Sequence, residues 1–227
     1  MGNVTQESWN PVWEDIFASN AWGKYPETEL VRFIARNFYQ TIDRKSIKIL
    51  DLGCGPGANL WYIAREGFSV SGIDGSKTAI KKLRERLSSE GIHADLHIGD
   101  IKELQFSDNT FDAVIDCECL CCNTMEFSRK ILTDIHRVLK PGGKFYSQTF
   151  APETWGCEKI VNIPGHFGCA VEEGPLLGKG GVRITTESDI DFLYGGLFDV
   201  VSIDFLSRSV NSGKNVIKEW IILCTKR

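Results

Sequence analysis

The chain has 227 residues, of which 42% are hydrophobic and 25% are charged, and this composition excludes a disordered or fibrous protein. Its 26 Lys and Arg residues against 30 Asp and Glu residues give a net charge of −4. A mildly acidic chain without a basic block is poorly suited to neutralising a phosphate backbone, so we expect no nucleic-acid partner. The length favours one domain with a core large enough to need no disulfides or metals.

The first ten residues, MGNVTQESWN, lack the positive start and apolar core of a signal peptide. No apolar run approaches the roughly 18 residues of a membrane span. The eight cysteines are interpreted as reduced thiols, because a chain of this size needs no disulfide framework. We therefore expect a cytoplasmic protein without a membrane partner.

Apolar residues at helical spacing predict two N-terminal helices, around residues 9–17 and 30–38. From residue 47 onward, strands alternate with helices and short turns. The predicted strands are residues 47–50, 68–73, 94–98, 111–116 and 144–150, and the predicted helices are 60–65, 79–87 and 131–139. The last of these helices is expected to stop at Pro141-Gly142-Gly143. This alternation indicates a parallel sheet that is covered on both faces.

The pattern changes after residue 150. Residues 151–185 contain three prolines and seven glycines, which indicate a long loop or insertion. The run from Thr186 to Asp189 has the capping-box pattern and predicts the start of a helix. Strand-like runs at 198–206 and 219–225, together with the turn signal Asn211-Ser-Gly213, predict a closing antiparallel hairpin.

A glycine-rich loop, Asp51-Leu-Gly53-Cys-Gly55-Pro-Gly57, follows the first strand and opens a helix. Glycines let the backbone approach a ligand closely, and a helix N-terminus offers free N–H groups to a negative group. Gly53, Gly55 and Ala58 also satisfy the dinucleotide fingerprint, with Asp74 near the place of its ribose-binding acid. The loop alone therefore leaves open a nicotinamide-dependent reductase, or a tight turn that binds nothing.

Five motifs that follow one another along the chain help to choose between these interpretations of the glycine loop. They are Asp51 two residues before the first glycine, Gly72-Ile-Asp74-Gly75-Ser76 at the second strand, Gly99-Asp100-Ile101 after the third, Phe111-Asp-Ala-Val-Ile-Asp116 on the fourth, and Arg137-Val-Leu-Lys-Pro-Gly-Gly143 before the fifth. Residues 47–150 therefore resemble the class I S-adenosylmethionine-dependent methyltransferases. The resemblance implies an α/β, Rossmann-like fold: a seven-stranded, mostly parallel sheet with an antiparallel last strand, helices on both faces and an N-terminal helical lid.

The resemblance also implies S-adenosyl-L-methionine as the cofactor and a small molecule as the methyl acceptor. Asp74 would bind the ribose hydroxyls, Asp100 would face the adenine amino group, and Asp51 would accept from the ammonium of the methionine tail, directly or through water. The expected cofactor-binding residues are Asp51, Gly53, Cys54, Gly55, Gly57, Asp74, Gly75, Ser76, Asp100, Ile101, Cys117 and Tyr25. The atom that receives the methyl group stays open.

We expect one methyltransferase domain over residues 1–227. It comprises an N-terminal helical lid (1–45), a cofactor-binding core (46–150), an acceptor-side insertion (151–185) and a C-terminal helix and hairpin (186–227). His166 is the candidate general base, because it lies in the insertion, where loops carry function. It is equally compatible with an exposed loop residue, and the oligomeric state stays open.

The stretch Cys117-Glu-Cys119-Leu-Cys121-Cys122 could bind a soft metal. However, it lacks a second Cys or His pair at zinc spacing, and a strand end sends alternate side chains to opposite faces. We therefore expect no metal site and interpret the thiols as cavity walls. The helically spaced Trp9 and Trp13 are interpreted as packing residues. A non-catalytic, partner-binding relative of these enzymes is an alternative, although the intact glycine loop and acids argue against it.

Overall fold

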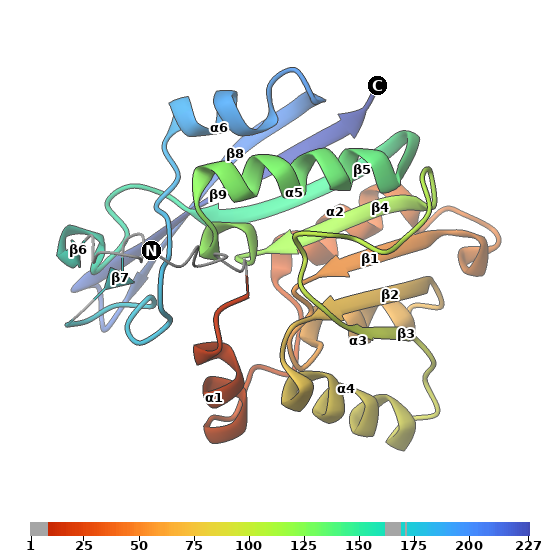
Figure 1. Cartoon of the computed structure of the whole chain (residues 1–227), viewed down its shortest axis with the longest axis horizontal. Coiled ribbons are helices and arrows are strands. Elements are labelled where there is room, and N and C mark those ends of the chain that lie inside the picture. The colour runs from red at the N-terminus through yellow and green to blue at the C-terminus, as the bar shows by residue number, and fades with distance from the viewer. Residues whose placement is uncertain (1–8, 162–168, 171) are drawn as a thin grey trace, which may run out of the picture.

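A seven-stranded sheet of order β3-β2-β1-β4-β5-β9-β8 runs through the computed structural model, which describes residues 9–161, 169–170 and 172–227 (Figure 1). Its strands are β1 (Lys48–Leu52), β2 (Ser69–Asp74), β3 (Asp95–Ile98), β4 (Phe111–Cys117), β5 (Leu139–Phe150), β8 (Phe198–Val210) and β9 (Asn215–Lys226). Within the described strands of this sheet, only the pairs that β9 makes with β5 and β8 are antiparallel. The mostly parallel sheet with an antiparallel last strand is therefore confirmed.

Helices cover both faces of this sheet (Figure 1). They are α2 (Thr28–Phe38), α3 (Ala58–Arg65), α4 (Lys77–Ser89), α5 (Met125–Val138) and α6 (Glu187–Tyr194), whereas α1 (Val12–Ser19) packs against α4. Short 3-10 turns lie at η1 (Arg44–Ser46), η2 (Leu120–Cys122) and η3 (Cys157–Lys159). Side chains alternate between the faces of a strand, so Ile49 packs in one core with α2, α3 and α4. Its neighbour Leu50 packs in the other core with α5 and α6.

Polar side chains fix where several helices begin. The Ser76 hydroxyl accepts from the backbone N–H of Ala79 at the start of α4, and Thr124 does the same for Phe127 at the start of α5. At α6, Thr186 and Asp189 form the reciprocal capping box that their spacing predicts. These caps satisfy N–H groups that the first turn of a helix otherwise leaves unpaired.

The fifth strand begins earlier than its sequence pattern suggests. Helix α5 ends at Val138, and Leu139 already pairs with Phe111 of β4. The register then shifts, so that Lys144 is the next residue to pair, opposite Ala113. The prediction of a strand start at residue 144 was wrong, because the proline and glycines form an irregularity inside β5 rather than a turn before it.

The insertion between β5 and α6 lies along the carboxyl edge of the sheet and contains a small two-stranded sheet, β6 (Ile160–Val161) with β7 (Cys169–Ala170). Its last residues are fixed by backbone hydrogen bonds from Arg183 N to Cys121 O (2.7 Å) and from Thr185 N to Phe150 O (2.9 Å). Leu176 is fully buried. The predicted base His166 lies outside the described residues.

Candidate active site

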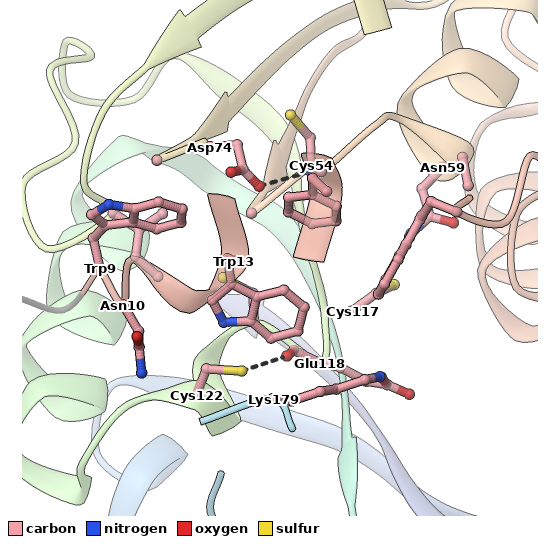
Figure 2. A pocket seen from close by; sticks show the side chains of 18 of the residues that line it. Trp9, Asn10, Trp13, Cys54, Asn59, Asp74, Cys117, Glu118, Cys122 and Lys179 are labelled. Atoms are coloured by element: carbon pink, nitrogen blue, oxygen red, sulfur yellow. Dashed lines mark hydrogen bonds between the residues drawn. The ribbon is translucent and has the colours of Figure 1, made fainter. Parts of the chain in front are cut away.

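A cavity of about 220 Å³ opens where the carboxyl ends of β1, β2 and β4 meet the glycine loop. The chain turns from β1 to β2 on one side and reaches β4 on the other, and such a reversal of strand order is where open α/β sheets bind ligands. Figure 2 shows Asp74 and Cys54 at one end of this cavity and Glu118 and Lys179 at the other.

The glycine loop is shaped by backbone conformations that favour glycine. Gly53, Gly55 and Gly57 all have positive φ angles, between 51° and 84°. A Cβ atom on Gly53 would lie 2.2 Å from the sulfur of Cys119, so a larger residue would displace the segment after β4. Gly57 also stands as the N-cap of α3. The loop can therefore approach a ligand closely only with glycine at these places.

Asp74, at the end of β2, ties this loop to the next one. Its Oδ2 accepts from Gly55 N, and its Oδ1 accepts from Ser76 N, both at 2.8 Å. Burial raises the pKa of Asp74, and the two amide donors counteract that rise. The carboxylate also lines the cavity, where its remaining lone pairs are available to hydroxyl donors.

Asp51 lies behind the glycine loop rather than in the cavity wall. It is 2% exposed, and its Oδ2 has no hydrogen-bond partner within the described part of the chain. Burial, followed by the charge of Asp74, raises the pKa of Asp51 to about 8. An unpaired buried oxygen of this kind needs a donor or an ordered water.

Aromatic residues from the N-terminal segment form another wall. Trp13, Phe17 and Trp22 contact one another at centroid distances of 5.1–6.2 Å. Trp9 donates its backbone N–H to Asp100 Oδ2 at 3.3 Å, and its ring lies over Gly75, where a Cβ atom would come within 2.4 Å of the indole. Trp9 and Trp13 are thus cavity residues as well as packing residues. The spacing in the sequence placed both residues on one helix face, but α1 begins at Val12, so Trp9 lies before the helix.

The segment after β4 holds an unusual carboxyl group. Glu118 has a φ of +59°, a conformation that non-glycine residues rarely adopt. It is held there by a hydrogen bond from Glu118 N to Gln148 O, and the Cys121 and Cys122 thiols donate to Glu118 O. Burial and the adjacent Glu219 raise the pKa of Glu118 to about 8.

A chain of buried hydrogen bonds supports Glu219. The Tyr146 hydroxyl donates to Gln148 Oε1 at 2.8 Å, and Gln148 Nε2 donates to Glu219 Oε1 at 2.8 Å. The sequence analysis missed Glu118 and Gln148 as site residues. The sequence signal for Gln148 is a polar residue inside an apolar strand. Glu118 lies between two cysteines, and the local pattern gives no signal for a carboxyl group in the site.

Nine of the twelve residues expected to bind the cofactor line the cavity: Gly53, Cys54, Gly55, Asp74, Gly75, Asp100, Ile101, Cys117 and Tyr25. Asp51, Gly57 and Ser76 do not. Ser76 is buried at the start of α4, where its hydroxyl donates to Glu14 of α1. These three residues shape the cavity from behind.

The cysteines of the segment after β4 are close together without forming a recognisable metal centre. Cys117, Cys119 and Cys122 line the cavity, whereas Cys121 is buried. Burial raises the pKa of Cys117 and Cys119 well above the usual thiol value, which favours neutral thiols. Among the residues described, no group of three or more His, Cys, Asp or Glu side chains is arranged to hold a metal ion.

The same residues include no helix that is both long enough and apolar enough to cross a membrane. The cavity wall carries four carboxyl groups, from Glu27, Asp74, Asp100 and Glu118. Lys179 is the one Lys or Arg residue that lines the cavity in the part of the chain described. The site is therefore acidic and suits a ligand that is cationic or rich in hydrogen-bond donors.

Comparison with known proteins agrees with this geometry. Residues 49–143 match the profile of a methyltransferase domain family. The chain is 32% identical over 106 residues to a phthiotriol/phenolphthiotriol dimycocerosates methyltransferase of Mycobacterium tuberculosis, a match that covers 46% of this chain and 38% of that protein. The chain spans less than half the length of such curated relatives.

Similarity to solved structures extends over most of the chain. A SAM-dependent methyltransferase of Methanosarcina mazei has a TM-score of 0.69 and 25% identity, covering 85% of this chain and 96% of that one. The magnesium protoporphyrin IX methyltransferase of Synechocystis, solved with bound SAH, has a TM-score of 0.67 and 17% identity over 95% of this chain and 93% of that one. The second similarity concerns the fold alone.

Proposed function

Since the chain belongs to the class I S-adenosylmethionine-dependent methyltransferases, we propose that it transfers the methyl group of S-adenosylmethionine to a small molecule. The observation that carries this proposal is the acidic cavity beside the glycine loop, with Asp74 and Asp100 in its wall. The cofactor bears a positive sulfonium and an ammonium against one carboxylate, and its ribose and adenine offer hydrogen-bond donors. An acidic, acceptor-rich wall complements that ligand.

The residues present fit the cofactor. We assign the ribose hydroxyls to Asp74, and the adenine ring to Asp100 and Ile101. Tyr25, Gly75 and Cys117 complete the wall around it. The buried Oδ2 of Asp51, which has no partner in the described ranges of the chain, suits an ordered water that joins it to the ammonium of the methionine tail. Gly53 and Gly55 have no side chain, so they would let the methionine tail approach the loop backbone closely, while the Gly55 N–H stays engaged with Asp74.

The protein itself needs to supply little of the activation for methyl transfer. S-Adenosylmethionine supplies a methyl group that is already activated on a sulfonium. The cavity residues therefore need to bind, orient the acceptor and exclude water, and proximity can contribute about 7 to 11 kcal/mol. The aromatic wall of Trp13, Phe17 and Trp22 is suited to excluding water. A base is required only where the acceptor must lose a proton, and His166 stays a prediction for that role.

The domain limits also remain proposals. We propose that residues 1–227 act as one methyltransferase domain, with the N-terminal segment as a lid and residues 151–185 on the acceptor side. The relatives named above act on different molecules, according to their names, so similarity does not identify the acceptor.

Titration calorimetry with S-adenosylhomocysteine and with NADH tests this proposal. We expect the nucleoside to bind and NADH not to bind, because the carboxylates in the wall repel a diphosphate. Asp74→Ala should weaken nucleoside binding by about 1.5 to 3 kcal/mol, the cost of losing hydrogen bonds to a charged group. Asp95→Ala, an exposed aspartate on neighbouring β3, is the matched control. Binding of NADH alone would contradict the proposal, and a protein partner without cofactor binding would favour a non-catalytic role.

A further inference from the structure

The cavity has a second end that the cofactor assignment does not use. Most of the residues assigned to the nucleoside follow β1, β2 and β3, which lie on one side of the sheet, and Cys117 at the end of β4 lies between the two ends of the cavity. Glu118 follows β4, and Gln148 lies on β5, the next strand on the other side. Both line the cavity together with Asn123 and Lys179. We call these four residues the acceptor end.

Asn123 presents an unused hydrogen-bond acceptor there. Its side chain is 3% exposed, and its Nδ2 donates to Cys119 O at 3.4 Å. Its Oδ1 has no partner among the residues that the structure describes. The backbone of Asn123 is fixed by Arg183, whose guanidinium donates to Asn123 O at 2.7 Å. Asn123 lines the cavity, and a buried oxygen that lacks a donor costs free energy, so a ligand N–H or O–H group that reaches this side chain would be favoured.

Glu118 provides a second hydrogen-bond acceptor. Its backbone conformation is strained, and its carboxyl group has buried neighbours. Its left-handed backbone is uncommon for glutamate, and conformations of this kind concentrate at functional sites. Its carboxyl group hydrogen-bonds to Glu219, which is 3% exposed and is fixed by Gln148. The charges that act on Glu118 are Glu219 and Glu27, which disfavour its ionisation, and Lys179, which favours it. Acids therefore outnumber the cation around Glu118.

We propose that the acceptor end binds a small molecule through an amino group and that Glu118 takes the proton which this nitrogen must lose before it is methylated. The inference rests on the proposed function, since it names the acceptor class for that same cavity. An ammonium group brings several N–H donors and a positive charge, and it can satisfy Glu118 and Asn123 Oδ1 together. A hydroxyl brings only one donor, and a carboxylate would be repelled.

The step balances without another reactant. The ammonium form of the acceptor gives a proton to the Glu118 carboxylate and becomes a neutral amine. The nitrogen lone pair then forms the new N–C bond while the C–S bond breaks, and the electrons of that bond remain on sulfur as a neutral thioether. The raised pKa of Glu118, about 8, suits a base that works near neutral pH.

Calorimetry on the protein saturated with S-adenosylhomocysteine tests the inference. The probes are aromatic and aliphatic amines, each with the alcohol and the carboxylate of the same skeleton, such as 2-phenylethylamine, 2-phenylethanol and phenylacetate. We expect amines to bind roughly tenfold or more tightly than their matched alcohols, the gain typical of hydrogen bonds to a charged group. Phenylacetate should not bind.

Variants identify the residues responsible. Glu118→Gln and Asn123→Leu should each weaken amine binding by roughly tenfold while affinity for S-adenosylhomocysteine stays within about twofold, which also reports folding. Glu126→Gln, an exposed glutamate on α5, is the control and should change neither. Absence of amine binding, equal binding of alcohols, or amine binding that survives Glu118→Gln would overturn the inference. Failure of the wild type to bind S-adenosylhomocysteine would instead contradict the proposed function.

Discussion

Asp51 contributes to the site through its burial rather than through direct exposure to a ligand. It is the acid that precedes the glycine loop, and the fold places it behind that loop at 2% exposure. Its position next to Asp74 sets two carboxyl groups in one buried region, and like charges there disfavour ionisation. The same burial therefore makes the stability of the protein sensitive to pH.

The pH dependence of stability tests this account of Asp51. Its pKa is 3.8 without burial and about 8 in the folded chain, so the folded state holds a proton that the unfolded state releases. The stabilisation is complete below about pH 4 and is lost as the pH rises through about 8. Asp51→Asn removes this titration. We expect the free energy of unfolding of the variant, relative to the wild type, to rise by more than about 1 kcal/mol between pH 5 and pH 8.5.

Urea unfolding at these two pH values provides the measurement. The raised pKa values of Asp116 and Glu118 act in the same direction, but they are common to both proteins and leave the difference to Asp51. Parallel pH profiles of the wild type and Asp51→Asn would show that the Asp51 carboxyl group is not perturbed by its surroundings.

Only some of the residues in the candidate site could be predicted from the sequence. Asp74 was predictable because an acid at the end of the second strand stands at a fixed place relative to the loop. The role of Glu118 depends on a left-handed backbone and on Glu219 from the last strand, and neither follows from local spacing. Asn123 became a candidate only when its Oδ1 proved to be buried without a hydrogen-bond partner among the described residues.

Among the elements, α1 shows how a short helix is held against the cavity. Its Glu14 accepts hydrogen bonds from the hydroxyls of Ser76 and Thr78 and from the backbone N–H of Thr78, at the N-terminus of α4. A helix N-terminus favours a carboxylate, and these donors lower the pKa of Glu14. Lys82 of α4 donates to Phe17 O at the other end of α1. These contacts hold the aromatic wall over the site.

Loosening this attachment should weaken cofactor binding. We expect Glu14→Gln to raise the dissociation rate of S-adenosylhomocysteine several-fold, because the Trp13 and Phe17 side chains would close less often over the cavity. The reference variant is Asp15→Asn, an exposed neighbour on the same helix. Stopped-flow tryptophan fluorescence measures the rate, and equal rates for both variants and the wild type would show that α1 does not gate the site.

Helices and strands were predictable where the pattern is local. The apolar spacing of α2 and α5 and the capping box of α6 indicated these helices from the sequence alone. The irregularity inside β5 was not predictable, because it depends on how Leu139 and Lys144 pair with β4. The two-stranded sheet in the insertion was also missed, since its strands have only two residues each.

For the whole molecule, the strand order explains where the cavity proposed to hold two ligands lies. The reversal between β1 and β4 opens a crevice at the carboxyl edge. Asp74 faces that crevice from one side, and Glu118 faces it from the other. A mostly parallel sheet with an antiparallel last strand could be expected from the sequence, whereas the strand order and the chemistry of the second side required the structure.

A crystal structure of the protein with S-adenosylhomocysteine tests the central claim, namely that this cavity holds the cofactor at one end and the acceptor at the other. We predict ribose hydroxyls within hydrogen-bond distance of Asp74, adenine between Asp100 and Ile101, and the sulfur atom directed toward Glu118. Electron density for the nucleoside elsewhere, or across Glu118 and Asn123 with Asp74 uncontacted, would contradict the account.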